Sequence, residues 1–575
     1  MSEIAALVSD HLEIWTAATE RKNGAGRGGS KRMNLYGIER LRALILDLAV
    51  RGKLVPQDAK DEPATALLYQ LKAERAKLMK AGLIGKGKSH PTVSQEPPFE
   101  IPAGWTWTQV SEIGHDWGQQ EPVGDFTYID VGSIDQRAGV VRAPNIVAAQ
   151  DAPSRARKVV RKGTVIYSTV RPYLLNIAIV DQDFDPEPIA STAFAIVHPF
   201  TGVEAGFIYR YLRSTAFVRY VESCQTGIAY PAINDRQFFA AWCPLPPTAE
   251  QARIVAKVNE LMALCDALEG ESAVALAAHQ ALVETLLATL VNSADAADLA
   301  ANWVRLETHF DTFFTTEASV DALKQAILDL AVRGKLVEQN NGDESAADLI
   351  KRLGEQLGDR RTGSSKGRQP KKIVASEALG FELPDGWAET TLGDVGETFI
   401  GLTYSPRDVS ETGIPVLRSS NVQNGEIDLT DLVRVRSQIR QKLFVEIGDL
   451  LICVRNGSRS LVGKCALIEE LSEPTTFGAF MAIYRSPLNR FVKLYIESQN
   501  FRRRLLGVET TTINQITQAN LKATPIPLPP LPEQHRIVSK VEALMAICHE
   551  LRAGITDAGE IQMRLADAVV ERAAS

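Results

Sequence analysis

The sequence predicts an α/β protein in which two globular mixed α/β domains are separated by long antiparallel coiled-coil helices, arranged as a pseudo-twofold internal repeat. Three observations support this fold class. The 575 residues exceed what one hydrophobic core holds. Several motifs occur twice, at nearly the same offset. An apolar 4,3 spacing, typical of coiled coils, follows one of these motifs in both copies.

The repeat is visible in three blocks. The sequence ILDLAVRGKLV at residues 45–55 occurs again, unchanged, 282 residues later. FEIPAGW at 99–105 recurs as FELPDGW at the same offset, and PLPPTAEQARIVAKV at 244–258 recurs as PLPPLPEQHRIVSKV at an offset of 283. Three blocks in one order indicate a duplication of most of the chain.

A long helix is expected after each PLPP block. In the first copy Thr248 and Gln251 form a capping-box pattern. The predicted seam then runs through Ile254, Val258, Leu261, Cys265, Leu268, Ser272, Ala275, His279, Leu282 and Leu286, and in the second copy through Ile537, Val541, Leu544, Cys548, Leu551, Ile555, Ala558, Gln562, Leu565 and Val569. His279 and Gln562 are either a register-setting polar layer or side chains in a loosened seam, and we interpret Cys265 and Cys548 as apolar fillers.

Between the repeated blocks the two halves diverge, so a similar frame carries two different inserts. Branched and aromatic residues predict strands at 164–170, 189–197, 450–454 and 479–484. Helices are expected at 207–219 and 490–506, and Gly-, Ser-, Lys- and Pro-rich linkers at 82–98 and 354–372. Two different inserts on one frame suggest the same task performed on two targets.

Composition narrows the function classes. The net charge of −7 argues against a protein that binds DNA phosphates without partner subunits, because such proteins are usually basic. The six cysteines form no CxxC pair, which argues against a zinc site or a disulfide framework. The sequence contains no run of 18 or more apolar residues, which argues against a membrane span. Its acidic start does not resemble a secretory signal. We expect a cytoplasmic protein with no membrane association.

Two segments match the residue patterns of nucleotide-binding motifs but lack the predicted strands and helices that such motifs require. Residues 82–89 match the P-loop pattern, but a charged helix is predicted before them and His90-Pro91 follows. Residues 24–29 match GxGxxG, but no strand is predicted before them. We interpret both as flexible connectors. The sequence shows no catalytic constellation, so we expect no enzyme, no metal and no cofactor bound by this chain.

The paired LDLAVRGKLV blocks, the Pro-x-Gly-Trp motifs and the PLPPxxEQxRIVxKV motifs together resemble the specificity subunit of type I restriction–modification systems. The resemblance covers nearly the whole chain. It implies two target-recognition domains that each read one half of a split, asymmetric double-stranded DNA sequence. It also implies docked methyltransferase subunits (two are expected) and restriction subunits, with S-adenosylmethionine, ATP and Mg on those partners.

This resemblance and the repeat together divide the chain. We expect an N-terminal conserved helical region (1–57), a helix and linker (58–98), recognition domain 1 (99–247), a central conserved coiled-coil region (248–338), a helix and linker (339–380), recognition domain 2 (381–527) and a C-terminal conserved coiled-coil helix (528–575). Because the second frame copy is split between both ends of the chain, those ends should lie close together.

Candidate DNA contacts are basic and polar side chains on the inserts. For phosphates we select Arg155, Arg157, Lys158, Arg161 and Lys162 in the first insert, and Arg434, Arg436, Arg440 and Lys442 in the second. Nearer the bases we place Ser168, Arg171, Tyr173, Tyr230 and Asn234, and then Arg418, Asn421, Arg455, Asn456, Arg459, Asn514 and Gln515. The alternative for each is a solvated surface charge or a satisfied loop polar group.

Two other functions stay open. One is a specificity subunit that serves a methyltransferase without a restriction partner. The other is a coiled-coil scaffold whose inserts bind proteins rather than DNA. The genomic neighbours distinguish the first alternative, and a gel shift with the methyltransferase subunit present distinguishes the second.

Overall fold

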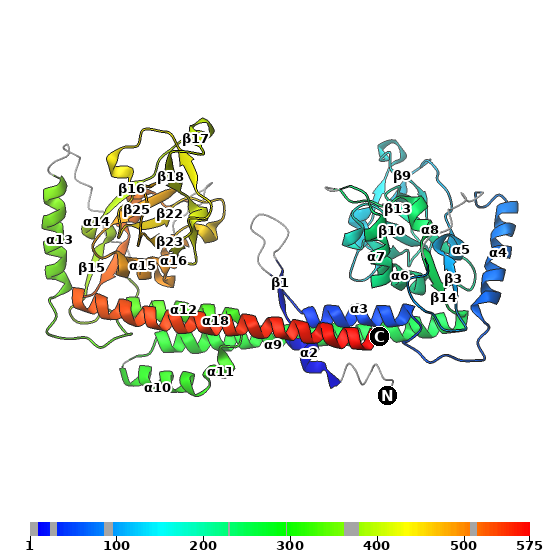
Figure 1. The fold of residues 1–575 in the computed structure, drawn as a ribbon, viewed down its shortest axis with the longest axis horizontal. Coiled ribbons are helices and arrows are strands. Elements are labelled where there is room, and N and C mark those ends of the chain that lie inside the picture. The colour runs from blue at the N-terminus through cyan, green and yellow to red at the C-terminus, as the bar shows by residue number, and fades with distance from the viewer. Residues whose placement is uncertain are drawn as a thin grey trace. The chain divides into compact units, whose positions relative to one another are not determined.

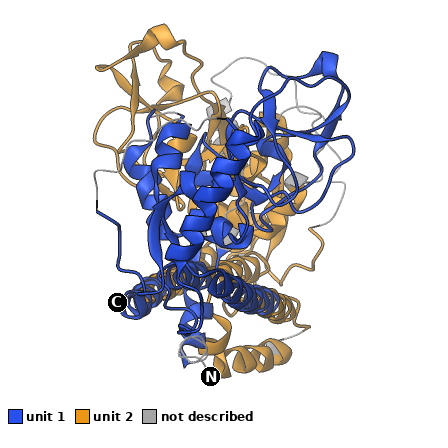
Figure 2. Cartoon of the chain, turned by 90° about the vertical axis from the view of Figure 1, so that its right-hand side faces the viewer, with its two compact units in different colours: residues 1–23, 31–274, 559–575 blue, residues 24–30, 275–558 orange. Residues whose placement is uncertain are grey.

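The computed structural model describes residues 10–22, 32–85, 96–227, 230–294, 296–361, 379–506 and 515–574 (Figure 1). They form two compact units, which Figure 2 shows in different colours. The described residues of unit 1 lie within 10–274 and 559–574, and those of unit 2 within 275–558. Each unit holds one insert and parts of three frame helices.

The frame of unit 1 consists of α3 (Tyr36–Val50), the first part of α9 (Thr248–Val291) and the last part of α18 (Leu531–Ala574). Their apolar faces share one core. In unit 2, α12 (Glu317–Val332) takes the place of α3 and packs with the remaining parts of α9 and α18. The helices adopt this arrangement because each carries an apolar stripe that must be buried.

Polar contacts fix the helix directions in unit 1. Arg42 of α3 pairs with Asp266 of α9 at 2.7 Å, and Gln57, which follows α3, donates to Glu250 near the start of α9. Hence α3 runs antiparallel to α9. Tyr36 donates to Asp567 at 2.9 Å. Lys53 Nζ donates to the Ala574 carbonyl oxygen at 3.2 Å, so α3 runs parallel to α18. The first frame helix of the chain therefore packs on the last, as predicted.

Unit 2 repeats these directions. Arg552 of α18 pairs with Glu317, the first residue of α12, at 2.9 Å, and Gln339 beyond α12 donates to Glu533 near the start of α18. Lys335 Nζ donates to the Val291 carbonyl oxygen at the end of α9 at 3.3 Å. Within each unit, the segments of α9 and α18 therefore run antiparallel to one another.

The predicted seam is correct in the first part of each long helix and loses phase with the core in the second, although Val569 still packs against the frame core. Ile254, Val258, Leu261 and Cys265 are all at most 2% exposed. Further along, the predicted Leu282 is 51% exposed, whereas the next residue, Val283, is buried, and likewise Ala566 is buried in place of Leu565. A straight helix drifts against a strict heptad repeat, so an uninterrupted 4,3 pattern loses phase with the core. The fillers Cys265 and Cys548 are buried as predicted.

Helix α9 also contains an 18-residue stretch with a mean hydropathy of 1.6, long and apolar enough by composition to cross a membrane. Only 22% of that stretch is buried. Such a helix is weak evidence for a membrane span, and the seam residues of α9 pack in the frame cores.

The first insert contains two sheets and a joining strand pair. The larger sheet has the order β4-β13-β10-β11-β7-β6 and the smaller the order β8-β5-β12-β9, while β3 pairs with β14. The strands are β3 (Thr106–Gln109), β4 (Gly114–His115), β5 (Phe126–Ile129), β6 (Ile134–Asp135), β7 (Val140–Val141), β8 (Asn145–Val147), β9 (Ala156–Val159), β10 (Val165–Ser168), β11 (Ile177–Ile179), β12 (Pro188–Ser191), β13 (Phe194–Pro199) and β14 (Trp242–Leu245).

The second insert repeats this plan, but its two main sheets have four strands each. The sheets have the orders β16-β25-β22-β23 and β17-β21-β18-β24, and β15 pairs with β26. The strands are β15 (Ala388–Thr391), β16 (Glu397–Ile400), β17 (Val409–Ser410), β18 (Ile414–Leu417), β21 (Val433–Val435), β22 (Leu450–Cys453), β23 (Cys465–Leu467), β24 (Thr476–Phe477), β25 (Met481–Arg485) and β26 (Pro525–Leu528), with a separate β19 (Val422–Gln423)–β20 (Glu426–Ile427) pair.

Each predicted insert helix is two helices, broken at a buried serine. Ser214 separates α6 (Ala205–Arg213) from α7 (Thr215–Cys224), and Ser498 separates α15 (Asn489–Glu497) from α16 (Gln499–Leu506). Each serine hydroxyl also bonds backbone groups on both sides of the break. The remaining helices are α2 (Leu12–Ala17), α4 (Ala64–Lys80), α5 (Val110–Ile113), α8 (Asp235–Ala240), α10 (Ala296–Thr308), α11 (Phe310–Phe313), α13 (Ala346–Arg361), α14 (Leu392–Val395) and α17 (Gln518–Ala523), and a short β1 (Glu20–Lys22)–β2 (Arg32–Asn34) pair precedes α3.

Candidate nucleic-acid interface

The motif residues shared by both halves join each insert to its frame. Trp105 Nε1 donates to Glu250 Oε2 at 2.9 Å, and Gln57 Nε2 donates to Glu250 Oε1 at 2.6 Å. Burial raises the pKa of Glu250, because removing a carboxylate from water is unfavourable. The hydrogen bonds from Trp105 and Gln57 act in the opposite direction and stabilise the charged form. Unit 2 has the same arrangement, with Trp387 and Gln339 donating to Glu533.

The glycine of the RGKLV block explains the Pro-x-Gly-Trp motif. Gly52 has φ +71°, and a Cβ there would lie 2.4 Å from Pro102 and 3.1 Å from the Trp105 ring. Only glycine allows both that backbone conformation and that contact. Its neighbour Arg51 lies over the Phe99 ring at 5.1 Å. The counterparts are Gly334, Pro384, Trp387, Arg333 and Phe381.

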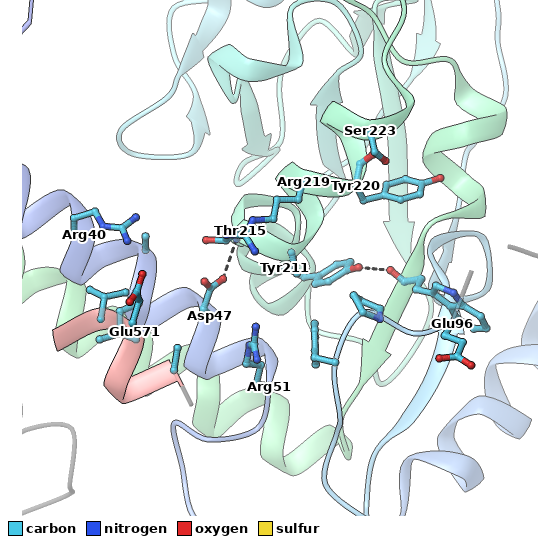
Figure 3. Close-up of a pocket in the computed structure, with 18 residues that line it drawn as sticks. Arg40, Asp47, Arg51, Glu96, Tyr211, Thr215, Arg219, Tyr220, Ser223 and Glu571 are labelled. Atoms are coloured by element: carbon cyan, nitrogen blue, oxygen red, sulfur yellow. Dashed lines mark hydrogen bonds between the residues drawn. The ribbon is translucent and has the colours of Figure 1, made fainter. Parts of the chain in front are cut away.

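The aspartate of the same block holds an insert helix. Asp47 Oδ1 accepts a hydrogen bond from the Thr215 backbone N–H at 2.9 Å, at the start of α7, and Asp329 accepts one from the Gln499 N–H in unit 2. In unit 1 this junction borders a cavity of about 480 Å³ between α3, the end of α18 and the insert helices (Figure 3). Figure 3 also shows Tyr211, whose hydroxyl donates to the Trp242 carbonyl oxygen. The shared motifs thus join each insert to its frame, and the two inserts differ in the surfaces away from these motifs.

In the first insert, three of the five predicted base-contacting residues meet at the end of β10. The 3₁₀ turn Pro172–Leu174 follows this strand, and Arg171 lies over the Tyr230 ring at 4.7 Å. Tyr173 and Tyr230 are 54% and 66% exposed. Asn234 is exposed too, but its Oδ1 caps α8 by accepting from the Gln237 N–H. The structure therefore brings Arg171, Tyr173 and Tyr230 to one exposed turn.

Four of the five predicted phosphate-binding residues of this insert remain accessible at least in part. Arg155, Arg161 and Lys162 are exposed, and the Arg161 guanidinium lies over the Trp117 ring at 4.1 Å. Arg157 is half-buried and pairs with Glu121 at 3.1 Å.

Three predicted contacts are corrected. Lys158 is 3% exposed, and its ammonium bonds Asp116 and Asp235, each at 3.2 Å. Ser168 is buried with its hydroxyl donated to the Val170 carbonyl oxygen. Asn421 is 1% exposed and donates to the carbonyl oxygens of Asp428 and Asp431. Buried polar groups need partners, and these three side chains satisfy internal groups instead of facing DNA.

The second insert builds a counterpart turn after β22. There the 3₁₀ turn is Arg459–Leu461, and the two turns correspond because Val170↔Ala232 and Arg455↔Gln515 form equivalent isolated bridges. Arg455 lies over the Phe480 ring at 5.1 Å, and Gln515 is exposed. Asn456 accepts from the Ser458 N–H, and Arg459 is exposed. Asn514 lies outside the described residues, as do 86–89 and 24–29 of the two glycine-rich patterns.

The other predicted basic residues of the second insert are partly committed to internal pairs. Arg434 binds Glu473 through two bonds, of 2.8 and 2.5 Å, and Arg418 pairs with Asp431 at 3.1 Å. Arg436 is exposed and donates to Thr412. Arg440 and Lys442 are exposed beside a short 3₁₀ turn. Arg436, Arg440 and Lys442 are therefore better placed to bind phosphates than Arg434 and Arg418.

One aromatic cluster in the first insert has no recognisable sequence motif. His115 and His198 lie on paired strands, with ring centroids 5.3 Å apart, and Trp117 packs on both. Burial, His115 and the Arg161 guanidinium lower the pKa of His198 to about 4. Among the described residues, no three His, Cys, Asp or Glu side chains are grouped to hold a metal ion.

Comparisons with known proteins agree with this arrangement. Residues 384–558 match the family model described as the type I restriction modification DNA specificity domain. The chain is 35% identical over 594 residues to the EcoAI specificity subunit of Escherichia coli, covering 99% of each chain, and 35% identical over 607 residues to the EcoEI specificity subunit of the same species, again covering 99% of each.

A chain solved in work on complex assembly and conformational transition of the type I R-M system shares the fold. It has a TM-score of 0.51 at 24% identity, with 83% of this chain and 99% of that chain covered. Together with the two relatives matched over their full lengths, these findings establish that the chain belongs to the family of type I restriction enzyme specificity subunits.

Proposed function

We propose that this chain is the DNA-reading subunit of a type I restriction–modification complex and that it recognises a bipartite, asymmetric target, with one half-site per recognition domain. The observation that carries the proposal is the repeated Trp–Glu–Gln junction, which holds two inserts with different exposed turns on equivalent frames. A protein with a twofold internal repeat suits two half-sites on one duplex. Divergent turns suit two different half-site sequences.

The partners follow from the duplicated frame and from the names of the relatives. Two copies of one frame offer two equivalent docking surfaces, which supports two methyltransferase subunits per chain. Restriction subunits then join this assembly. The relatives are specificity subunits of enzymes named as type I restriction enzymes, which supports the same set of partners.

In this proposal the chain recognises the DNA sequence and catalyses no reaction. S-adenosylmethionine, ATP and Mg belong to the partner subunits, and the assembly acts in the cytoplasm. With a net charge of −7, the chain relies on its partners for much of the phosphate contact. We therefore expect weak DNA binding by the isolated chain and tighter, more salt-dependent binding once the methyltransferase subunits are present.

Methylome sequencing tests the proposal. A host without related systems would express this chain with its methyltransferase subunits, and methylated bases would be mapped across the genome. We expect a split, asymmetric motif that disappears when this chain is omitted. A continuous motif, or methylation that does not depend on this chain, would contradict the proposal.

A further inference from the structure

The turn after β10 exposes apolar side chains where a surface loop is normally polar. Val170 is 38% exposed, Tyr173 54% and Leu174 41%. Tyr230 is 66% exposed and lies next to this turn, because its ring packs under the Arg171 guanidinium. Single exposed apolar residues are ordinary, but several gathered on one turn indicate an interaction surface.

This turn is also held in an unfavourable backbone conformation. Arg171 has φ +50° and Leu175 has φ +49°, so left-handed non-glycine residues stand on both sides of the Pro172–Leu174 turn. The surrounding chain fixes them, because the Arg171 N–H donates to the Pro231 carbonyl oxygen and the Ser168 N–H to that of Asn176. Such strain persists where the surrounding structure overdetermines it, commonly at binding sites. The apolar side chains are therefore presented in a fixed arrangement.

The counterpart turn of the second insert has a different chemistry. Arg455 takes the place of Val170, and Ser460 takes the place of Tyr173 at the middle of the 3₁₀ turn. Leu461, 39% exposed, matches Leu174. The two turns thus share one leucine and one exposed aromatic ring under an arginine, which in the second domain is Phe480, 55% exposed. They differ where Arg455 and Ser460 replace Val170 and Tyr173.

We propose that the first recognition domain reads its half-site largely through apolar contact with thymine C5-methyl groups, made by Tyr173 and Leu174. Thymine is the base that presents a methyl group in the major groove, and apolar side chains are its usual partners. Arg171 and the exposed Arg155 and Lys162 supply positive charge on the same insert, which suits a DNA occupant. This inference rests on the proposed function and adds the chemical basis of discrimination in one half-site.

Deoxyuridine tests this directly, because it differs from thymidine only by the missing methyl group. The complex of the full chain with its methyltransferase subunits would be titrated against duplexes carrying the methylated motif, with each thymine of the first half-site replaced in turn. One lost methyl contact should weaken binding about fourfold. The same replacement in the unread spacer should leave affinity unchanged.

Two variants assign the effect to the turn. In Leu174→Ala and Tyr173→Ser complexes, binding to the thymine duplex should weaken, and the difference between thymine and deoxyuridine should shrink toward none. Leu461→Ala, the matched change in the second domain, should keep the full difference in the first half-site. Both side chains of the first turn are well exposed, so neither change opens the core.

Three results would overturn the inference. The first is a first half-site without thymine, and the second is a wild-type complex whose affinity does not change when deoxyuridine replaces thymine in that half-site. The third is that the variants lose affinity equally on the thymine and deoxyuridine duplexes, as stacking between bases would produce. The proposed function fails differently, since a complex that methylates no split motif would defeat it before any duplex is compared.

Discussion

The indole N–H of Trp105 donates a 2.9 Å hydrogen bond to the buried carboxylate of Glu250. Trp105 lies near the start of the first recognition domain, and Glu250 lies in the first turn of a frame helix. Trp387 and Glu533 repeat the relationship in the other unit, at 3.0 Å. The pair therefore ties each recognition domain to its frame.

Trp105→Phe is expected to loosen this junction. It leaves one carboxylate oxygen of Glu250 without its donor, which costs about 1–3 kcal/mol for a buried group. Amide hydrogen exchange should quicken in the first turns of α9 and in β3, while unit 2 exchanges as before. Trp107→Phe is the matched control, because Trp107 contacts Phe99 and Trp242 through its ring. Equal effects of both changes would argue against a specific role for the hydrogen bond.

Acid should destabilise unit 1 before unit 2. The pKa of His198 falls from 6.5 to about 4 in the folded state. The unfolded chain then binds more protons between these values, so stability is lost as pH falls through that window. At about 1.4 kcal/mol per pKa unit, the loss is on the order of 2–3 kcal/mol for this partly shielded group.

Hydrogen exchange at pH 7 and pH 5 measures this effect in each unit separately. His198→Gln keeps a polar partner for Thr164, which bonds the histidine at 2.9 Å, and it should flatten the pH response of unit 1. The counterpart strand β25 contains no histidine and provides the internal reference. A variant that keeps the wild-type pH response would assign the lability to other groups.

Lys162→Ala should weaken DNA binding by the complex without changing the motif. Lys162 is exposed, and a phosphate contact carries charge but no sequence information. The slope of log affinity against log salt should fall by about 1. Lys158→Met serves as the contrast, since it removes a buried partner of Asp116 and should destabilise the insert. An unchanged salt slope for Lys162→Ala would remove that residue from the phosphate contacts.

A circular permutant should keep both half-sites. Arg40 pairs with Asp567 at 2.7 Å, and Lys53 bonds the last described carbonyl oxygen, that of Ala574, so the frame helices from the two ends already pack together. Joining residue 575 to residue 1 by a short linker and opening the chain within 82–98 cuts no frame helix. The methylome of a host expressing the permutant should show the wild-type motif. A folded permutant that methylates another motif would refute the equivalence of the two ends.

Much of the fold could be predicted from sequence, because identical blocks at one offset reveal a duplication without any knowledge of packing. The repeat extends further than those blocks. His11 and His309 precede α2 and α11 with nearly the same backbone angles, φ −120° and −122°. Sequence comparison at a fixed offset missed this pair because the β1–β2 segment lengthens the first copy. Helix breaks at Ser214 and Ser498 were missed because the amphipathic pattern continues across them.

The candidate site was predicted less completely. The spacing of Arg171, Tyr173 and Tyr230 could not show that they meet, because a backbone bridge between distant loops brings them together. Lys158, Ser168 and Asn421 had suitable side chains but are buried. Residue type alone cannot distinguish a lysine that faces solvent from one that neutralises two internal carboxylates. Burial depends on sheet pairing, which the local sequence does not determine.

The division of α18 between the two units affects how the chain folds during synthesis. The described residues of unit 2 all lie between 275 and 558, whereas those of unit 1 lie on both sides of this segment, within 10–274 and 559–574. Domains usually fold from the N-terminus as they leave the ribosome. Here unit 1 gains its part of α18 only after residues 275–558 of unit 2 have been synthesised. A chain stalled near residue 558 would carry both recognition domains but would lack the α18 segment that completes the frame core of unit 1.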